Sequence, residues 1–325
     1  MSSAVRIGIV GVGDFGRRHA AVAAALPEVQ LVAVADRDRG RALTVAQELG
    51  CAAVGGIEEL LAERAVDAVV IATPQHRHLA DVRAAVEAGV PALVEKPVVS
   101  AGEEAQRLRE LVAGSGVLVV PAHVSRFLPG VAQLRERLAI EPAVAVRAVR
   151  VVPVERLDMH GGEHPALVAM VHDLDLVRAV LPPDAELVDV SSVQSWTEPR
   201  RPHPQVVMAQ LTFSDGSLAS VENRWTLPHA RQYIDARMEV TTRRWTAHLQ
   251  TPSGGLRIAT GAGDLLPDTD LEATVAGLPV GALATQLRHF AACVSAGRRS
   301  EVVDLEDGLW SVEVAARIAA QQPQR

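Results

Sequence analysis

Residues 5–16, with the sequence VRIGIVGVGDFG, decide how the rest of the chain is interpreted. Val5–Val10 is a short apolar run rich in Val and Ile, which favours a buried β-strand. An alanine-rich segment from Arg17 to Leu26 predicts a helix soon afterwards. Between strand and helix lie the six residues of a G-x-G-x-x-G pattern: Gly11, Val12, Gly13, Asp14, Phe15 and Gly16. A pattern of this kind between a strand and a helix is typical of a dinucleotide-binding turn.

The three glycines have separate roles in such a turn. Gly11 permits the tight turn, Gly13 lets the backbone approach a pyrophosphate, and Gly16 lets the helix lie close to the strand. The helix N-terminus then faces the phosphates. The sequence therefore predicts a phosphate-binding turn at residues 11–16.

A second predicted strand, Leu31–Ala35, ends at Asp36. An acidic residue at this distance from the glycines accepts hydrogen bonds from the adenosine ribose hydroxyls. A carboxylate would repel a 2′-phosphate, so we expect NAD rather than NADP. Arg37 is adjacent and could stack on adenine or, as the alternative, bind that phosphate.

The alternation of strands and helices continues to residue 122. We expect helices at 38–49, 57–63, 76–88 and 101–113, and strands at 67–73, 91–94 and 117–120. Repeated units of this kind predict a doubly wound parallel sheet, and therefore an α/β Rossmann domain over residues 1–122. Ligands bind such sheets at the carboxyl ends of the strands, where the glycine turn, Thr73–Pro74 and Lys96 would all lie.

Residues 123–325 follow a different pattern. Helices are expected at 126–138, 166–181, 284–296 and 305–320, and a long loop at 254–280. Strands are expected at 143–154, 186–196, 206–213, 217–225, 232–240 and 244–250. Most of these strands follow one another without intervening helices, which predicts a large, mainly antiparallel sheet. We expect a C-terminal α+β domain that binds substrate and mediates oligomerisation.

Lys96 is the only lysine among 32 basic residues. Arginine stays protonated at ordinary pH, whereas a partly desolvated lysine can lose its proton. A step that needs a movable proton or a point charge at a reacting oxygen can therefore use lysine and not arginine. The alternative is that one lysine survived a strong arginine bias. Its position at a predicted strand end favours the chemical role.

Composition excludes several other classes of protein. The chain has 325 residues, 48% of them hydrophobic and 22% charged, which fits a globular protein of about two domains. Aromatic content of 3% and a net charge of −7 argue against a nucleic-acid surface. No apolar run is long enough to span a membrane, and the N-terminus does not resemble a signal peptide. Cys51 and Cys293 lie far apart, so we expect a reduced cytoplasmic protein.

Histidines offer two further candidate sites. A metal site from His160, Glu163 and His164 is conceivable, but the loop is short and contains Gly161-Gly162, so we expect none. His172 lies on a predicted helix among apolar neighbours, where a histidine is more often structural than functional. Spacing alone leaves both interpretations of His172 open.

Taken together, the motifs resemble those of the Gfo/Idh/MocA family, the oxidoreductases related to glucose–fructose oxidoreductase and inositol dehydrogenase. The resemblance covers nearly the whole chain. It is carried by GVGDFG at 11–16, ATPQHRH at 72–78, EKP at 95–97, HVSRF at 123–127, HDLD at 172–175 and VDLEDG at 303–308. A glycine turn followed by E-K-P and H-D-x-D makes a specific combination.

The resemblance implies an NAD(H)-dependent oxidoreductase acting on a secondary alcohol or ketone of a sugar, sugar nucleotide or cyclitol. Lys96 would polarise or deprotonate the reacting oxygen, and His172 would assist it. The resemblance also implies a homodimer or homotetramer that pairs through the open sheet face. Residues expected around the cofactor are Thr73, Pro74, His78, Glu95, Lys96 and Arg126. Candidate substrate residues are His123, His160 and Asp173.

The chain departs from the family pattern at two positions. Many members carry an aspartate four residues before the histidine, where this chain has Val168, and Gln75 replaces the usual asparagine. The loss of that carboxylate puts the inositol-dehydrogenase type of proton relay in doubt. Lys96 and His172 could suffice without it, or another group could replace it, the candidates being His160, Glu163 and Asp173.

Two other functions stay open on this fold. One is a sensor or regulator that binds the cofactor without turnover, and the other is a reductase of a non-sugar substrate. The HVSRF segment resembles that of members acting on nucleotide-linked amino sugars, which favours an enzyme with such a substrate.

Overall fold

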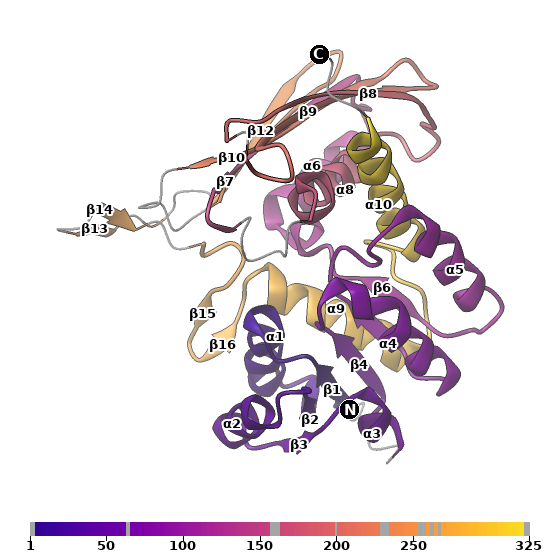
Figure 1. Ribbon diagram of the computed structural model, residues 1–325, viewed down its shortest axis with the longest axis vertical. Helices are drawn as coiled ribbons and strands as arrows, with labels where there is room; N and C mark the ends of the chain where they lie inside the picture. The colour runs from indigo at the N-terminus through magenta and orange to yellow at the C-terminus, as the bar shows by residue number, and fades with distance from the viewer. Residues whose placement is uncertain are drawn as a thin grey trace. The chain divides into compact units, whose positions relative to one another are not determined.

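The computed structural model describes residues 4–62, 66–156, 163–198, 200–227, 234–252, 256, 258–260, 263–265 and 268–321. The chain forms two compact units (Figure 1). The first comprises Met1–Phe127 and Glu272–Leu309, and the second Leu128–Leu271 and Trp310–Arg325. The chain therefore returns to the first unit after building most of the second.

A six-stranded parallel sheet forms the centre of the first unit. Its strand order is β3-β2-β1-β4-β5-β6. The strands are β1 (Val5–Val10), β2 (Val29–Ala35), β3 (Ala52–Val54), β4 (Ala68–Ile71), β5 (Ala92–Val94) and β6 (Val119–Pro121). The predicted doubly wound parallel sheet is confirmed. The sequence did not predict β3, because a run of three residues is too short to distinguish a strand from a connecting segment.

Helices cover both faces of this sheet. They are α1 (Asp14–Ala25), α2 (Arg39–Leu49), α3 (Ile57–Ala62), α4 (Gln75–Glu87), α5 (Gly102–Val112) and α9 (Ala282–Ala296). Helix α1 contacts α2, and α4 contacts α5 (Figure 1). Right-handed crossovers place these two pairs on opposite faces. Helix α9 contacts α1 within this unit.

The strand order fixes where a ligand can bind. The chain runs outward from β1 to β2 and β3, then returns to β4 on the other side of β1. Neighbouring crossovers therefore leave β1 and β4 in opposite directions, which opens a crevice at their carboxyl ends. The glycine turn follows β1 and Thr73 follows β4, so both lie at this edge.

A mixed sheet forms the second unit, with strand order β12-β11-β7-β10-β9-β8. Its strands are β7 (Ala145–Pro153), β8 (Leu187–Ser195), β9 (Val206–Phe213), β10 (Leu218–Leu227), β11 (Asp235–Thr241) and β12 (Thr246–Thr251). The sheet is mainly antiparallel, as predicted, but β7 and β10 are parallel neighbours. Sequence adjacency could not reveal that pair, because β8 and β9 lie between its members along the chain.

One face of this second sheet packs against helices, and along β9 the described residues of the other face are exposed. Buried and exposed residues alternate along β9, as expected for a sheet covered on one side. Helices α6 (Pro129–Leu138) and α8 (Val171–Val180) contact the sheet, and a π-helical turn, η2 (Ala166–Met170), leads into α8. Pairing of two chains through the open face stays a prediction.

The predicted helix at 126–138 is wrong at its start. A 3₁₀ turn, η1 (Val124–Phe127), comes first, and α6 begins only at Pro129. Leu128 between them is extended, with φ −65° and ψ 132°. Proline disfavours a helical residue before it and lacks the N–H that continues a helix, so Pro129 starts a new helix.

The predicted long loop at 254–280 is also wrong in its described part. It contains two short hairpins, β13 (Ile258–Thr260) with β14 (Gly263–Leu265), and β15 (Thr274–Val275) with β16 (Leu278–Pro279). The second closes through Ala276 and Gly277, whose φ angles are 51° and 82°. Two central residues with positive φ make the turn that suits a two-residue hairpin.

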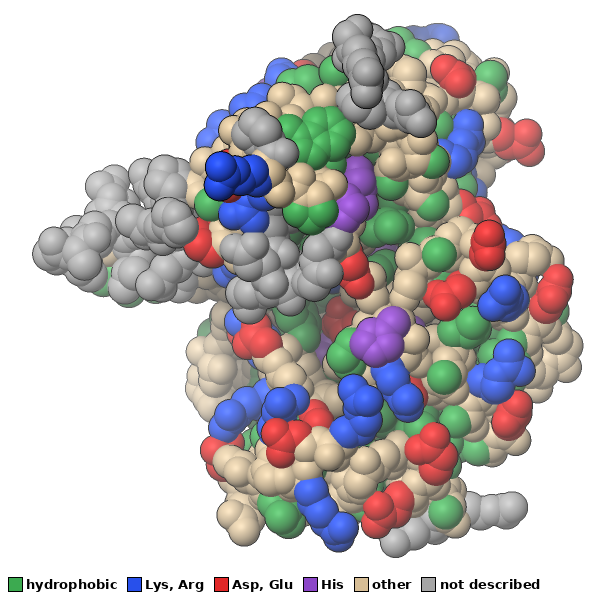
Figure 2. Space-filling model, viewed as in Figure 1, with side chains coloured by type: hydrophobic (Ala, Val, Ile, Leu, Met, Phe, Trp, Pro, Cys, Tyr) green, Lys and Arg blue, Asp and Glu red, His purple; other side chains and the backbone are tan. Residues whose placement is uncertain are grey.

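Charged side chains of both signs lie on the described surface. On the face drawn in Figure 2, arginine and acidic side chains are interspersed over the first unit. Among the described residues, no helix is long and apolar enough to cross a membrane. The same residues contain no group of three or more His, Cys, Asp or Glu side chains suited to a metal ion.

Candidate functional site

The glycine turn connects the end of β1 to the start of α1. Gly11 has φ +84°, a left-handed conformation that side chains rarely adopt, and its N–H donates to the Ala35 carbonyl oxygen at 2.7 Å. A Cβ on Gly11 would lie 2.7 Å from the Ala72 oxygen at the end of β4. The backbone at Gly11 therefore fits tightly between two neighbouring strands.

Gly13 and Gly16 have opposite surroundings. A Cβ on Gly16 would lie 1.8 Å from the Gly11 carbonyl oxygen, whereas a Cβ on Gly13 would have no described atom within 4 Å. Gly13 also precedes α1, whose N-terminus has no side-chain cap. Open space beside uncapped N–H groups suits a pyrophosphate. These residues therefore fit the NAD expected from the sequence.

Asp36, at the end of β2, supports the turn from the side. Its Oδ2 accepts a hydrogen bond from the Val12 N–H at 3.0 Å, and its Oδ1 accepts one from the Asp38 N–H at 2.8 Å. Arg41 Nη1 lies 3.3 Å from Asp36 Oδ2. Arg37 is exposed. A carboxylate next to the glycine turn fits the ribose diol, and binding of a 2′-phosphate by Arg37 stays the alternative.

Replacing Asp36 by serine should therefore change cofactor preference. We expect Asp36→Ser to weaken NADH binding by at least about tenfold, which is roughly 1.4 kcal/mol, because the ribose loses a charged acceptor. NADPH binding should improve, because the repulsion disappears while Arg37 and Arg41 stay. Fluorescence titration with both cofactors measures the ratio. An unchanged NADH-to-NADPH ratio would show that Asp36 does not read the ribose.

The end of β4 is held by a buried polar network. Thr73 Oγ1 donates to Asp81 Oδ2 at 2.6 Å, and Arg77 Nη2 binds Asp81 Oδ1 at 2.9 Å. His78 is buried, with Nε2 at 2.8 Å from the Thr73 carbonyl oxygen and Nδ1 at 2.8 Å from the Pro97 carbonyl oxygen. Burial lowers the pKa of His78, although both carbonyls act in the opposite direction. His78 thus links two strand ends.

Glu95 and Lys96 follow β5 at the same edge. Glu95 is buried, and its N–H donates to the Ile71 carbonyl oxygen of β4 at 2.8 Å. Its Oε1 lies 2.8 Å from His19 Nε2 on α1, and its Oε2 accepts the Lys96 N–H at 3.1 Å. Lys96 itself is half-buried. The sequence analysis did not single out His19. Its position three residues after Gly16, on the same face of the predicted helix, could have indicated it.

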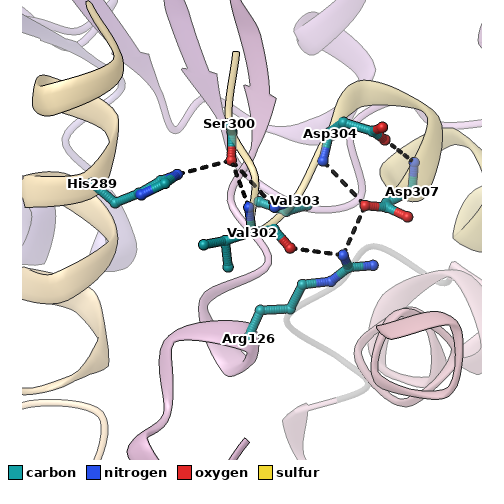
Figure 3. Close-up of polar contacts among 7 residues, drawn as sticks. All are labelled: Arg126, His289, Ser300, Val302, Val303, Asp304 and Asp307. Atoms are coloured by element: carbon teal, nitrogen blue, oxygen red, sulfur yellow. Dashed lines mark hydrogen bonds and ion pairs between the residues drawn. The ribbon is translucent and has the colours of Figure 1, made fainter. Parts of the chain in front are cut away.

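Arg126 contacts the C-terminal part of the first unit. Figure 3 shows Arg126 Nη1 directed at the Val302 carbonyl oxygen, 2.9 Å away, and at Asp307 Oδ2, 2.7 Å away. Asp304 and Asp307 also accept each other's backbone N–H, at the start of helix α10 (Leu305–Ala320). His123 is buried. Cofactor contact by Arg126 and substrate contact by His123 stay predictions.

The H-D-x-D motif lies on α8 of the second unit. Asp173 is buried and accepts two hydrogen bonds from Arg150 on β7, at 2.8 and 3.0 Å. Burial raises the pKa of Asp173, and Arg150 opposes that rise. His172 is half-buried on the same helix. Roles for His172 and Asp173 in catalysis or substrate binding stay predictions, and the predicted substrate residue His160 lies outside the described residues.

The structure gives Val168 an apolar environment. Val168 lies in η2 and packs with Val152, Ala169 and Trp225 in a buried cluster. An aspartate here would have to bury its charge among these side chains, which is costly without a partner. The packing therefore agrees with the valine in place of the acid that many family members carry. Glu163, the other candidate replacement for that acid, is half-buried, and its role stays a prediction.

The glycine turn, the acidic end of β2 and the parallel sheet define an NAD-binding domain. Residues 5–123 match the family model for oxidoreductases with an NAD-binding Rossmann fold. The chain is 35% identical over 222 residues to a UDP-N-acetylglucosamine 3-dehydrogenase of Acidithiobacillus ferrooxidans, covering 67% of this chain and 66% of that protein. It is 32% identical to inositol 2-dehydrogenase 1 of Saccharopolyspora erythraea, covering 79% of this chain and 77% of that protein.

A solved structure agrees over almost the full length. It is a UDP-N-acetylglucosamine 3-dehydrogenase from Acidithiobacillus ferrooxidans, with a TM-score of 0.81 and 27% identity, covering 98% of this chain and 97% of that chain. The chain therefore belongs to the Gfo/Idh/MocA family, as the motifs predicted. It is a dehydrogenase acting on CH–OH groups of sugar-type substrates.

Proposed function

We propose that the chain oxidises or reduces one ring carbon of a nucleotide-linked amino sugar, with Lys96 as the main acid/base or oxygen-polarising group. His172 assists in this proposal on the strength of the H-D-x-D motif. The main alternative among sugar-type substrates is a cyclitol. The likeness to a UDP-N-acetylglucosamine dehydrogenase, together with the HVSRF segment, supports the first.

One observation carries the role of Lys96. The only lysine of the chain follows β5 at the carboxyl edge of the sheet, the same edge at which the glycine turn follows β1. His78 and Glu95 connect the backbone on either side of Lys96 to β4 and α1. A fixed backbone is what a catalytic amine needs, because misplacement by about 1 Å can cost a hundredfold in rate.

The chemistry divides between cofactor and chain. NAD held by the glycine turn and Asp36 would supply a hydride acceptor for the alcohol carbon in the oxidation to a ketone, and a hydride donor in the reverse reduction. Lys96 takes the hydroxyl proton during oxidation, or holds the carbonyl oxygen and returns the proton during reduction. Because Val168 supplies no carboxylate, Lys96 carries more of this proton transfer than in relatives with an aspartate at that position.

The substrate class is tested by following NADH absorbance with a panel of substrates. We expect turnover with UDP-N-acetylglucosamine or a related nucleotide sugar in the presence of NAD⁺, and at least about tenfold lower kcat/KM with free myo-inositol, scyllo-inositol and glucose. Preference for an inositol would identify the cyclitol alternative. Absence of turnover with every sugar, cyclitol and sugar nucleotide, despite NADH binding, would favour a sensor or regulator.

A further inference from the structure

A buried hydrogen bond joins the phosphate-binding helix to the residue before Lys96. His19 Nε2 lies 2.8 Å from Glu95 Oε1, and the His19 side chain is 0% exposed. His19 shares the buried face of α1 with Gly16, Ala20 and Ala23. The helix whose N-terminus suits the pyrophosphate therefore also contacts the Glu95–Lys96 turn.

Glu95 transmits this contact to the Lys96 backbone. One carboxylate oxygen is bonded to His19, and the other accepts the Lys96 N–H at 3.1 Å. Burial raises the pKa of Glu95, but the hydrogen bond and charge of His19 and the charge of Lys96 outweigh it, so the net pKa is lowered. The two carboxylate oxygens of Glu95 therefore hold α1 and the lysine turn together.

The contacts of His19 differ from those of an ordinary core histidine. His19 Nδ1 is buried and has no hydrogen-bond partner among the described residues, so the bond to Glu95 is the polar contact that orients the ring. His78, by contrast, has both ring nitrogens 2.8 Å from backbone carbonyl oxygens, of Thr73 and of Pro97, so it lies against the far side of the turn. The turn keeps the His78 contacts if His19 is replaced, so His19 variants should fold.

We propose that His19 is a positioning residue for Lys96, acting through Glu95. It fixes the lysine backbone relative to the helix that binds the cofactor phosphates. The Lys96 amine is thereby held at a constant position relative to the bound cofactor. This inference rests on the proposed role of Lys96. It predicts that loss of the His19 bond lowers the rate of the chemical step more than it lowers cofactor affinity.

The test compares His19→Leu with His19→Gln. Leucine removes the bond, whereas the glutamine side-chain amide can donate to Glu95 from about the same place as Nε2. We expect His19→Leu to lower kcat by about tenfold to a hundredfold with the NADH Kd within about twofold of wild type. His19→Gln should recover most of the rate. His289→Leu is the control, because it removes a comparable histidine bond, to Ser300 at 2.9 Å, in the same unit.

The single lysine provides a readout that needs no turnover. Reductive ¹³C-methylation labels Lys96 and otherwise the N-terminal amine, so one NMR signal reports the Lys96 side chain. We expect that signal to shift or broaden in His19→Leu, to return towards wild type in His19→Gln, and to be unchanged in His289→Leu. Circular dichroism confirms that each variant is folded.

Three results would overturn the inference. Wild-type kcat in His19→Leu, with an inactive Lys96→Arg, would reject the positioning role and leave the proposed function intact. Equal loss of kcat and NADH affinity in the Leu and Gln variants would make His19 merely structural, as would a Leu variant that unfolds without rescue by Gln. Turnover by Lys96→Arg would instead reject the proton-transfer role of Lys96, on which the inference rests, and absence of turnover by the wild type with every sugar, cyclitol and sugar nucleotide would reject the proposed function itself.

Discussion

Lys96→Arg should bind NADH with an affinity close to that of the wild type and lose turnover by about a hundredfold to ten-thousandfold. That range is what a positioned acid or base contributes to a reaction. Arginine keeps the positive charge and a similar length, but it does not release a proton at ordinary pH. Single-turnover measurements with a saturating substrate isolate the chemical step, and fluorescence titration gives the NADH Kd.

An exchange between arginine and lysine at an exposed position is the control. It shows whether such an exchange changes turnover when the residue lies away from the site. Arg83 lies exposed on α4, so Arg83→Lys should leave both kcat and the NADH Kd unchanged. Lys96→Met tests charge, because it removes the ammonium and keeps most of the volume. If Lys96→Arg retained more than about a tenth of wild-type turnover, electrostatic polarisation would suffice and Lys96 would not be the proton-transfer group.

Gly13→Ala and Gly16→Ala should separate cofactor binding from folding. The Gly13 Cβ would enter open space, and its φ of −66° suits alanine, so we expect unfolding free energy within about 0.5 kcal/mol of wild type. The same methyl would lie where the backbone must approach the pyrophosphate. NADH affinity should therefore fall at least about tenfold.

Gly16→Ala should give the opposite result. Its Cβ would lie 1.8 Å from the Gly11 carbonyl oxygen, so α1 must move away from the turn. We expect a destabilisation of more than about 3 kcal/mol, at the upper end for overpacking, because backbone atoms cannot give way as a side chain can. Denaturant unfolding measures both variants. Equal stability losses in the two would contradict the assignment of Gly13 to the pyrophosphate and Gly16 to packing.

The sheet of the second unit shows which strand pairs local sequence patterns can predict. Alternating residues and turns predicted consecutive strands and a mainly antiparallel sheet, because each hairpin is a contact between near neighbours in sequence. The parallel pair of β7 and β10 has no such local signal. Pro129 did carry one, since proline restricts the residue before it, and the predicted helix at 126–138 overlooked it.

The sequence by itself determined the dinucleotide-binding domain and the residues at its ligand edge. Glycine spacing reflects the geometry of one turn, and apolar runs and helical periods reflect one strand or helix. Both can therefore be recognised in the sequence without knowledge of the tertiary structure. The unusual status of Lys96 was likewise visible from composition alone.

Only the tertiary structure decided which side chains hold that edge together. The bond from His19 to Glu95 joins residues 76 apart, and the bond from the Val12 N–H to Asp36 joins residues 24 apart. Such contacts depend on which strands are neighbours and which helix face is buried. Local sequence propensity predicts neither of these. The glycine turn and Lys96 could be found in sequence, but their connection through α1 and Glu95 could not.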